Sequence, residues 1–491
     1  MPDDEKWLPI KFGPASNGEF LPVPHSPMLR ETIRRTHALA EDNARRLGIS
    51  RRRFLLGASG AAATLFTLSA CSKEEAKSTG TTVGGEFDVS PESTIDEDRA
   101  ADELGGQEFI FDVQSHYVNA EIDPLGGAWT ASFPQYGCPE GAEDGDPLTC
   151  FTVSAYFLEM FARSDTSMAI ISALPAQVEG ALPVDEMTRA VDMATRIGCD
   201  GRVLIHGGAY PHRGSIEAAL AGMDDVRADY DIAAWKIYTM TPVADHFYFD
   251  DHDPARPQIG QRFIDHVREI GPPIICTHKG LSGIVGSSPE LADPRDIGPA
   301  ASANPDISFV VYHSGFEPGM GVGPYDPADP APQGVDRLIR SLETSGIEPN
   351  SNVYAELGGT WWFLMGNPTE AAHVLGKLLK HVGEDRVVWG TDSIWFGTPQ
   401  DQIQAMRTFE ITTEFQERFG YPALTSEIKA KIFGLTSAAL YDVDPIRGRC
   451  DVSTQELSQV RMSYGPTRTY GPETAAAAAA MIAAHQKGYA L

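Results

Sequence analysis

The stretch Phe109-Ile-Phe-Asp-Val-Gln-Ser-His-Tyr117 decides how the rest of this 491-residue chain is interpreted. It begins with a short apolar run, which predicts a strand buried in a parallel sheet. Side chains alternate between the two faces of a strand, so Asp112, Gln114 and His116 are expected to share one face. A histidine at the end of a buried strand is a candidate metal ligand, and the later strands decide whether it has partners.

From this stretch onward, apolar runs rich in β-branched residues alternate with helix-like patterns. The runs expected to form strands are residues 109–113, 168–172, 202–206, 232–237, 273–277, 307–312, 352–356 and 387–391. Strands that alternate with helices form a parallel sheet with right-handed crossovers. Eight such units predict an α/β fold of the (β/α)8 TIM-barrel type, since no glycine-rich dinucleotide fingerprint follows the first run. Residues 399–419 and 426–440 are expected to be amphipathic helices that close the barrel.

The chain is expected to have four parts. We expect residues 1–71 to be an export signal and residues 72–106 to be a disordered linker, because the linker is rich in Ser, Thr, Gly and acidic side chains. Residues 107–445 are expected to form the barrel domain. Residues 446–491 predict a C-terminal helical extension, with an alanine-rich helix near the end. The formal net charge of −29 argues against nucleic acid and anionic membrane surfaces as partners, so we expect a small-molecule substrate. A homo-oligomer is compatible with this composition.

The signal segment has two recognisable parts. Arg51, Arg52 and Arg53 precede an uncharged run that ends at Cys71, a pattern similar to a twin-arginine signal. The run is too short, and too rich in Gly, Ala and Ser, to predict a membrane span. Leu68-Ser-Ala-Cys71 resembles a lipobox, which predicts an exported, periplasmic or cell-surface protein anchored by a lipid on Cys71. The alternative is cleavage near Ala70, which would release a soluble product.

The functional site of a barrel of this kind lies at the C-terminal ends of its strands. The expected strands present there Gln114, His116, His206, Lys236, His278, His313, Glu356 and Asp392. Three histidines and one aspartate on different strand ends are hard to explain as structural residues. Converging imidazoles with one carboxylate suit Zn²⁺ or another borderline divalent ion such as Mn²⁺.

The order of these residues resembles the amidohydrolase superfamily, and within it the amidohydrolase-related branch that contains decarboxylases and lactonases. The resemblance spans about residues 109–441 and is most specific at Val388-Trp-Gly-Thr-Asp392. The motifs that carry it are Asp112-x-x-x-His116, Lys236, His278, His313-x-Gly315 and Gly390-Thr-Asp392.

The resemblance implies a metal ligand set of Gln114, His116, His278 and Asp392. The first strand of the family normally supplies His-x-His, and Gln114 stands here for the first histidine. An amide oxygen binds zinc less well than imidazole does. Three outcomes stay open: Gln114 is a weak or indirect ligand, Lys236 compensates as a carboxylated oxygen ligand, or the metal is lost and a binding pocket remains.

The expected catalytic residues are Asp392, His313 and Lys236. A divalent ion lowers the pKa of bound water towards about 7, and Asp392 would accept the proton of that water. By the resemblance, His313 would polarise the substrate carbonyl or act as general acid. Lys236 has a structural alternative, an ion pair with Glu356 or Asp392.

Glu356, His206, Trp361 and Trp395 are the candidate substrate-binding residues. The tryptophans suggest a pocket for a flat or apolar substrate, and the alternative is packing of long loops. We therefore expect a metal-dependent hydrolase that cleaves an ester, lactone or amide bond in a small carboxylate- or ring-bearing molecule. The alternatives are a non-hydrolytic metal-dependent decarboxylase, and a non-catalytic binding protein on the same barrel.

Overall fold

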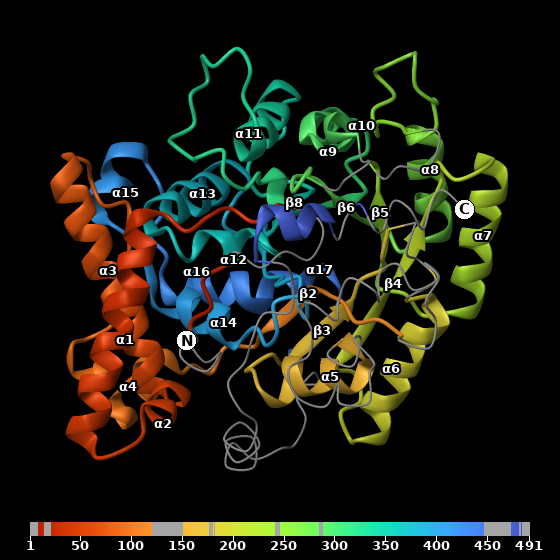
Figure 1. The fold of residues 1–491 in the computed structure, drawn as a ribbon. Coiled ribbons are helices and arrows are strands. Elements are labelled where there is room, and N and C mark those ends of the chain that lie inside the picture. Colours follow the sequence, from red (N-terminus) through yellow and green to blue (C-terminus); the bar gives the residue numbers. More distant parts are fainter. Residues whose placement is uncertain are drawn as a thin grey trace.

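Eight parallel strands form the centre of the molecule, which we describe from a computed structural model (Figure 1). The structure describes residues 8–13, 21–119, 151–175, 180, 182–240, 246–283, 288–445, 473–480 and 483. The barrel strands, which neighbour one another in chain order, are β2 (Phe111–Ser115), β3 (Met168–Ile171), β4 (Val203–Ala209), β5 (Ala234–Tyr238), β6 (Ile274–His278), β7 (Ser308–Tyr312), β8 (Val353–Glu356) and β9 (Val387–Val388).

The ring closes where the last strand returns to the first. The Val113 N–H donates to the Trp389 carbonyl at 3.0 Å, and the Asp392 N–H donates to the Gln114 carbonyl at 2.9 Å. A parallel bridge between Ser115 and Ser393 continues this seam. The predicted (β/α)8 barrel is therefore confirmed.

Helices cover the outside of the strands because each presents one apolar face. In α8, for example, Phe263, Ile264 and Val267 are buried, at the spacing of one helical face. Full burial of such a side chain contributes about 1.5–3 kcal/mol. The covering helices include α6 (Val184–Arg196), α7 (Ile216–Asp229), α8 (Gly260–Ile270), α10 (Ile297–Ala303), α11 (Gly334–Thr344) and α13 (Pro368–His381).

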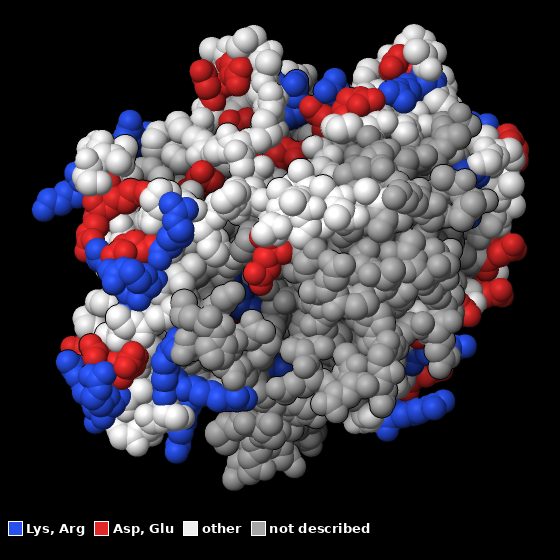
Figure 2. Space-filling model, viewed as in Figure 1, with Lys and Arg blue, Asp and Glu red and all other residues white. Residues whose placement is uncertain are grey.

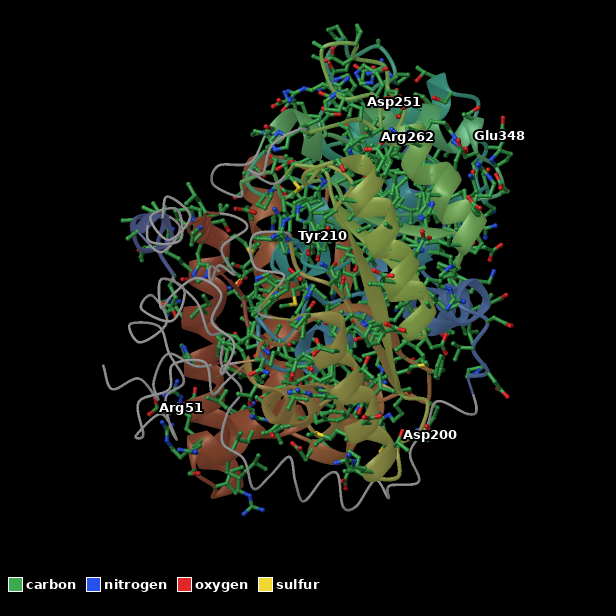
Figure 3. All side chains as sticks on the ribbon, turned by 90° about the vertical axis from the view of Figure 1, so that its right-hand side faces the viewer. Arg51, Asp200, Tyr210, Asp251, Arg262 and Glu348 are labelled. Carbon is green, nitrogen blue, oxygen red and sulfur yellow. The ribbon has the colours of Figure 1, made fainter. Side chains whose placement is uncertain are left out.

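Asp251 fixes the start of α8. Its carboxylate accepts hydrogen bonds from the N–H groups of Gly260 and Gln261, both at 2.9 Å. Asp251 and Arg262 therefore lie at the same end of the molecule (Figure 3).

The first strand is irregular. The register of β2 against β3 shifts between Asp112 and Ser115, and such a bulge re-aims side chains. Phe111 and Val113 both join the apolar cluster of alternate strand residues that includes Ile170 and Val310. Alternation therefore holds for Phe111 and Val113, and the register shift lies between Asp112 and Ser115.

An N-terminal group of helices lies against the barrel, on the left of Figure 1. It comprises α1 (Pro27–Leu47), α2 (Arg51–Leu56), α3 (Ala58–Thr79) and α4 (Glu97–Leu104). Figure 2 shows basic and acidic side chains gathered together over these helices, and their ion pairs include Glu31–Arg34 and Asp42–Arg45. No helix in the described part of the chain is both long enough and apolar enough to cross a membrane.

Two expectations about secondary structure are wrong. Residues 72–106 are not a disordered linker, because they contain the end of α3, the strand β1 (Gly85–Phe87) and α4. Residues 399–419 are not one helix, because β10 (Phe409–Ile411) interrupts them between α14 (Gln400–Thr408) and α15 (Thr413–Phe419). The two strands in these segments share one cause, since β1 pairs antiparallel with β10. This pairing joins segments more than 300 residues apart, which local patterns do not show.

The expected C-terminal extension falls mostly outside the described residues. Of residues 446–491, the structure describes 473–480 and 483, and residues 475–480 are helical there.

Candidate active site

Side chains from four strand ends meet at the mouth of the barrel in one chain of contacts. His116 Nε2 lies 3.3 Å from Asp392 Oδ1, and the Gln114 amide nitrogen donates to the same oxygen at 3.1 Å. That nitrogen lies 3.5 Å from His313 Nε2, which in turn lies 3.1 Å from His278 Nδ1. Each of the five side chains is at most 2% exposed. The structure therefore brings together five of the eight residues that the sequence placed at strand ends.

The backbone turns sharply where two of these residues sit. His313 has a φ of 64° and Asp392 a φ of 58°, in the left-handed region that residues other than glycine rarely adopt. Such conformations persist only when the surrounding structure holds them, and they cluster at functional sites.

Backbone carbonyls determine which nitrogen of each imidazole carries a proton. His313 Nδ1 lies 2.7 Å from the Gly358 carbonyl, which can only accept, so Nδ1 is the donor. Burial lowers the pKa of His313 to about 3, so its ring is neutral at pH 7 and Nε2 carries a lone pair. His278 Nδ1 must then donate to that lone pair, and His278 Nε2 carries a lone pair of its own. Burial also holds the pKa of His278 well below its usual value.

His116 follows the same rule. Its Nδ1 donates to the Ser172 carbonyl at 2.9 Å, which leaves Nε2 facing the Asp392 carboxylate. If His116 were neutral, the lone pair on its Nε2 would face an oxygen of the Asp392 carboxylate at 3.3 Å, and the two would repel each other. A cation between these two atoms, either a proton or a metal ion, removes that repulsion. Metal-binding histidines commonly donate their second N–H to a backbone carbonyl in this way.

The donor chemistry of the site fits a divalent metal. His116 Nε2, His278 Nε2 and the Asp392 carboxylate are all suitable ligands. Gln114 Oε1 is a buried oxygen without a hydrogen-bond partner among the described residues, and rotation of its amide exchanges this oxygen with the nitrogen beside Asp392. In the described part of the chain, however, no three His, Cys, Asp or Glu side chains are already grouped as a metal would need them. Ligation by His278 therefore requires its hydrogen bond with His313 to adjust.

A second layer of buried carboxylates holds the backbone beneath the mouth. Glu356 accepts hydrogen bonds from the N–H groups of His313, at 3.0 Å, and Gly358, at 2.5 Å. Asp112 accepts from the N–H groups of Gln114, at 3.0 Å, and Thr391, at 3.2 Å. Burial raises the pKa of Glu356 to about 8 and that of Asp112 to about 7. The hydrogen bonds from the N–H groups of His313 and Gly358 oppose this rise in the pKa of Glu356.

Lys236 and His206 lie in the barrel below the mouth, and both are fully buried. The Lys236 ammonium lies 3.6 Å from the centre of the Tyr312 ring and 4.6 Å from that of Tyr238, which is a cation–π arrangement. His206 Nδ1 is 3.2 Å from the Ser172 hydroxyl, and its Nε2 is 3.8 Å from the Cys276 thiol. These contacts place His206 among barrel residues rather than in the chain of side chains at the mouth.

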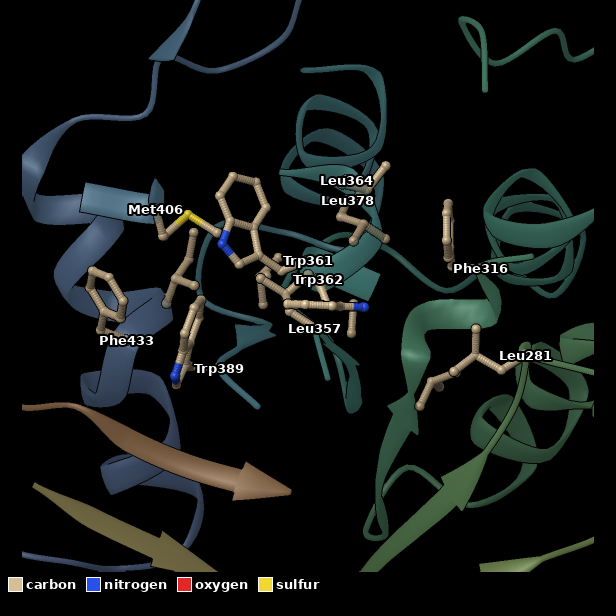
Figure 4. Packing of buried hydrophobic residues seen from close by; sticks show 14 of the residues in the cluster. Leu281, Phe316, Leu357, Trp361, Trp362, Leu364, Leu378, Trp389, Met406 and Phe433 are labelled. Carbon is tan, nitrogen blue, oxygen red and sulfur yellow. The ribbon is translucent and has the colours of Figure 1, made fainter. Parts of the chain in front are cut away.

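The two candidate tryptophans have different surroundings. Trp395 stacks on His116, with ring centres 5.8 Å apart. Trp361 is in α12 (Thr360–Leu364), is fully buried, and donates its indole N–H to the Gln402 carbonyl at 2.9 Å. Figure 4 shows Trp361 packed among apolar residues between the strands and helices, with Met406 nearby. This position favours a packing role for Trp361 over the substrate contact that we expected.

Sequence reasoning missed two groups that orient the histidines. Ser172 directly follows β3 and contacts both His116 and His206. The same strand-end rule that found the histidines could have found Ser172. The Gly358 carbonyl carries no side-chain signal, so only the structure could show that it orients His313.

Comparison with known families agrees with this geometry. A family model described as Amidohydrolase matches residues 173–443, which is more than half of the chain. The chain therefore belongs to the amidohydrolase family, whose superfamily consists largely of enzymes that typically use divalent metal ions. No curated protein matches the sequence.

Solved structures with a similar fold include enzymes of several kinds. An uncharacterised TIM-barrel protein from Bordetella bronchiseptica is 15% identical, with a TM-score of 0.42 over 68% of this chain and 98% of that chain. A 5-carboxyvanillate decarboxylase from Sphingomonas paucimobilis is 13% identical, with a TM-score of 0.40 over 69% and 100%. A dihydroorotase from Campylobacter jejuni is 11% identical, with a TM-score of 0.35 over 69% and 84%.

Proposed function

We propose that this protein is a metal-dependent hydrolase that cleaves an ester, lactone or amide bond in a small carboxylate- or ring-bearing molecule. One observation supports this above others: His116, Asp392, Gln114, His313 and His278 form one buried chain of contacts across four strand ends. A barrel that served only as a scaffold would gain nothing from grouping three imidazoles and a carboxylate, because burying them costs free energy.

A divalent metal, which we propose to be zinc, would be held by His116, His278 and Asp392, with Gln114 contributing through its amide oxygen. When bound, it would supply a Lewis acid and a water molecule with a lowered pKa. The Asp392 carboxylate is the base that takes the proton from the attacking water. The Gly358 and Ser172 carbonyls keep the proton of His313 and of His116 on Nδ1, so that both Nε2 atoms face the mouth.

His313 presents the lone pair of its Nε2 to the mouth, so it would hold the substrate carbonyl or return a proton to the leaving group only after Nε2 has accepted the proton released by the attacking water. It is neutral at pH 7 and its Nε2 lies within hydrogen-bond distance of His278. Trp395 stacks on His116 and can cover one face of a flat substrate. Lys236, buried below, adds positive charge that favours a carboxylate-bearing substrate.

The test is elemental analysis of the purified protein and of Asp392→Asn, followed by a substrate screen. We expect about one zinc or manganese ion per chain, reduced in the variant. Hydrolysis of esters, lactones or amides supports the proposal, whereas release of CO2 from aromatic carboxylic acids identifies the decarboxylase instead. Absence of metal from both proteins after reconstitution would leave the non-catalytic binding protein.

Export by a twin-arginine route and a homo-oligomeric state stay predictions, and a lipid anchor on Cys71 stays the alternative to retention of the N-terminal segment. Fractionation of producing cells tests the export and the anchor, and light scattering of the purified protein tests the oligomeric state.

A further inference from the structure

The segment that resembles an export signal is buried in the folded protein. Residues 58–72 of α3 are almost entirely buried, which is typical of a core helix rather than a removable leader. Gly60 lies so close to α2 that an added Cβ would come within 2.7 Å of the Phe54 carbonyl oxygen. Phe54 and Leu55, which follow the three arginines, are both 2% exposed.

Polar contacts tie α3 to its neighbours at both ends. At its start, Glu97 of α4 accepts hydrogen bonds from the N–H groups of Ala58, at 2.6 Å, and Ser59, at 3.0 Å. Further along, the Ser69 hydroxyl accepts from the Phe87 N–H at 2.9 Å. Phe87 belongs to β1, which pairs with β10, so α3 is bound to the end of α14 through this small sheet.

The predicted processing site lies inside this helix. Cys71 is 4% exposed, and α3 continues beyond it to Thr79. Peptidases cleave exposed, extended chain, so cleavage before Cys71 would require α3 to leave the core. Cleavage there would also remove α1 and α2. The remainder of α3 would then lose its contacts with α1.

Residues ahead of α1 reach the loop that carries site residues. Lys11 Nζ lies 2.9 Å from Asp401 Oδ1 and 2.8 Å from the Thr398 carbonyl, and the Lys11 N–H donates to Asp401 Oδ2 at 2.9 Å. The side chains of Lys11 and Asp401 are 7% and 2% exposed. The loop of residues 392–399 begins with Asp392, contains Trp395 and leads into α14, so Lys11 fixes its far end through Thr398 and through Asp401 in the first turn of α14.

We propose that residues 8–79 remain in the mature protein as a permanent helical layer, and that Lys11 is a positioning residue for the loop of residues 392–399 that leads into α14. The retention of this layer does not depend on the proposed function, whereas the effect of Lys11 on catalysis rests on it.

The first experiment is intact-mass measurement and N-terminal sequencing of the protein from each fraction of producing cells. We expect an N-terminus that precedes Lys11 in every fraction that contains folded protein. A mature chain that begins at Cys71, with the added mass of a lipid, would overturn the proposal, as would an unmodified chain that begins near that residue.

The second experiment measures hydrogen–deuterium exchange of peptides from residues 392–401 in Lys11→Met. We expect their exchange to become about tenfold faster or more, because Asp401 loses its buried partner, and Lys11→Arg to restore slow exchange in large part. Arg34→Met is the matched control, since it removes an exposed ion pair on α1 and should leave the loop unchanged. If Lys11→Met does not fold, Asp401→Asn tests the same contact.

Unchanged exchange of the loop in Lys11→Met, or equal acceleration in Lys11→Arg, would overturn the positioning role. These readouts need no substrate, so they remain valid if the proposed hydrolysis fails. If hydrolysis is found, Lys11→Met should lower kcat more than it changes KM, because the loop carries Asp392.

Discussion

Two layers of buried polar groups at the strand ends differ in what they bind. In the upper layer, His116, Asp392, Gln114 and His313 contact other side chains. In the lower layer, carboxylates bind the N–H groups of the main chain, as Glu356 does with His313. Side chains that contact one another can exchange partners for a ligand, whereas a carboxylate that satisfies backbone donors cannot move without leaving them unpaired.

The lower layer therefore keeps the strained turns of the upper layer in place. Glu356 binds the N–H of His313, and Asp112 binds the N–H of Thr391, next to Asp392. His313 and Asp392 are two of the positions with positive φ. Substitutions in the upper layer should therefore mainly reduce activity, and substitutions in the lower layer should mainly reduce stability.

The largest expected effect is loss of activity in the upper layer. Asp392→Asn removes the base and a metal ligand, so kcat should fall by about 10²–10⁴-fold while the melting temperature of the metal-free protein changes little. Glu348→Gln, at the exposed carboxylate labelled in Figure 3, is the control and should retain full activity and metal content. An Asp392→Asn protein with undiminished turnover would contradict the assignment of the upper layer.

The next effect concerns stability in the lower layer. Glu356→Ala leaves the N–H groups of His313 and Gly358 without their acceptor, at about 1–3 kcal/mol each, so the free energy of unfolding should fall by about 2–4 kcal/mol. Glu356→Gln keeps an acceptor oxygen for only one of these two N–H groups, so it should lose about half of that. Urea denaturation measures both, and equal losses in the two variants would show that the hydrogen bonds are not the cause.

A smaller effect is the dependence of stability on pH. Burial raises the pKa of Glu356 to about 8 and that of Asp112 to about 7, above the values near 4 of the unfolded chain. The folded state then binds more protons, so stability falls as pH rises through these values. Between pH 6.5 and 8 the loss from Glu356 should be about 2 kcal/mol. Thermal melts of Glu356→Gln should show a shallower decline, and a decline as steep as in the parent would refute this cause.

His313 does not disturb this comparison. Its pKa is lowered to about 3, so it destabilises the fold only as pH falls below about 6.5, where the unfolded chain takes up the proton.

The smallest effect separates the two tryptophans. Trp361→Phe removes a buried hydrogen bond and some core volume, so it should cost about 1–2 kcal/mol of stability with little change in KM. Trp395→Phe should change KM several-fold with little change in stability, because Trp395 stacks on His116. Parallel melts and kinetics check both, and the reverse pattern would place Trp361 rather than Trp395 in the substrate pocket.

Much of the barrel could be predicted from the sequence. Each expected apolar run coincides with a strand to within a few residues, as with residues 273–277 and β6. The ends of the expected strands then indicated Gln114, His116, His278, His313 and Asp392, although the sequence gives no distances between these side chains. This worked because strand periodicity is local and the barrel brings all strand ends to one rim.

The N-terminal region could not be predicted in the same way. An uncharged run after three arginines has the composition of a signal, and only the structure shows that this run forms α3 and packs against α1, α4 and β1. Likewise, nothing local distinguishes Trp361 from Trp395. Both cases concern which surface a side chain meets, and that depends on segments far away in the chain.

The sequence by itself determined the barrel and the identity of the groups at its mouth, because periodicity and strand ends are encoded within a few residues. Only the tertiary structure decided where the protons of His116 and His313 lie, since the Ser172 and Gly358 carbonyls that hold them come from other strand ends. It also decided that Lys11 meets Asp401, 390 residues away. Such contacts depend on how the whole chain packs, and no local pattern records them.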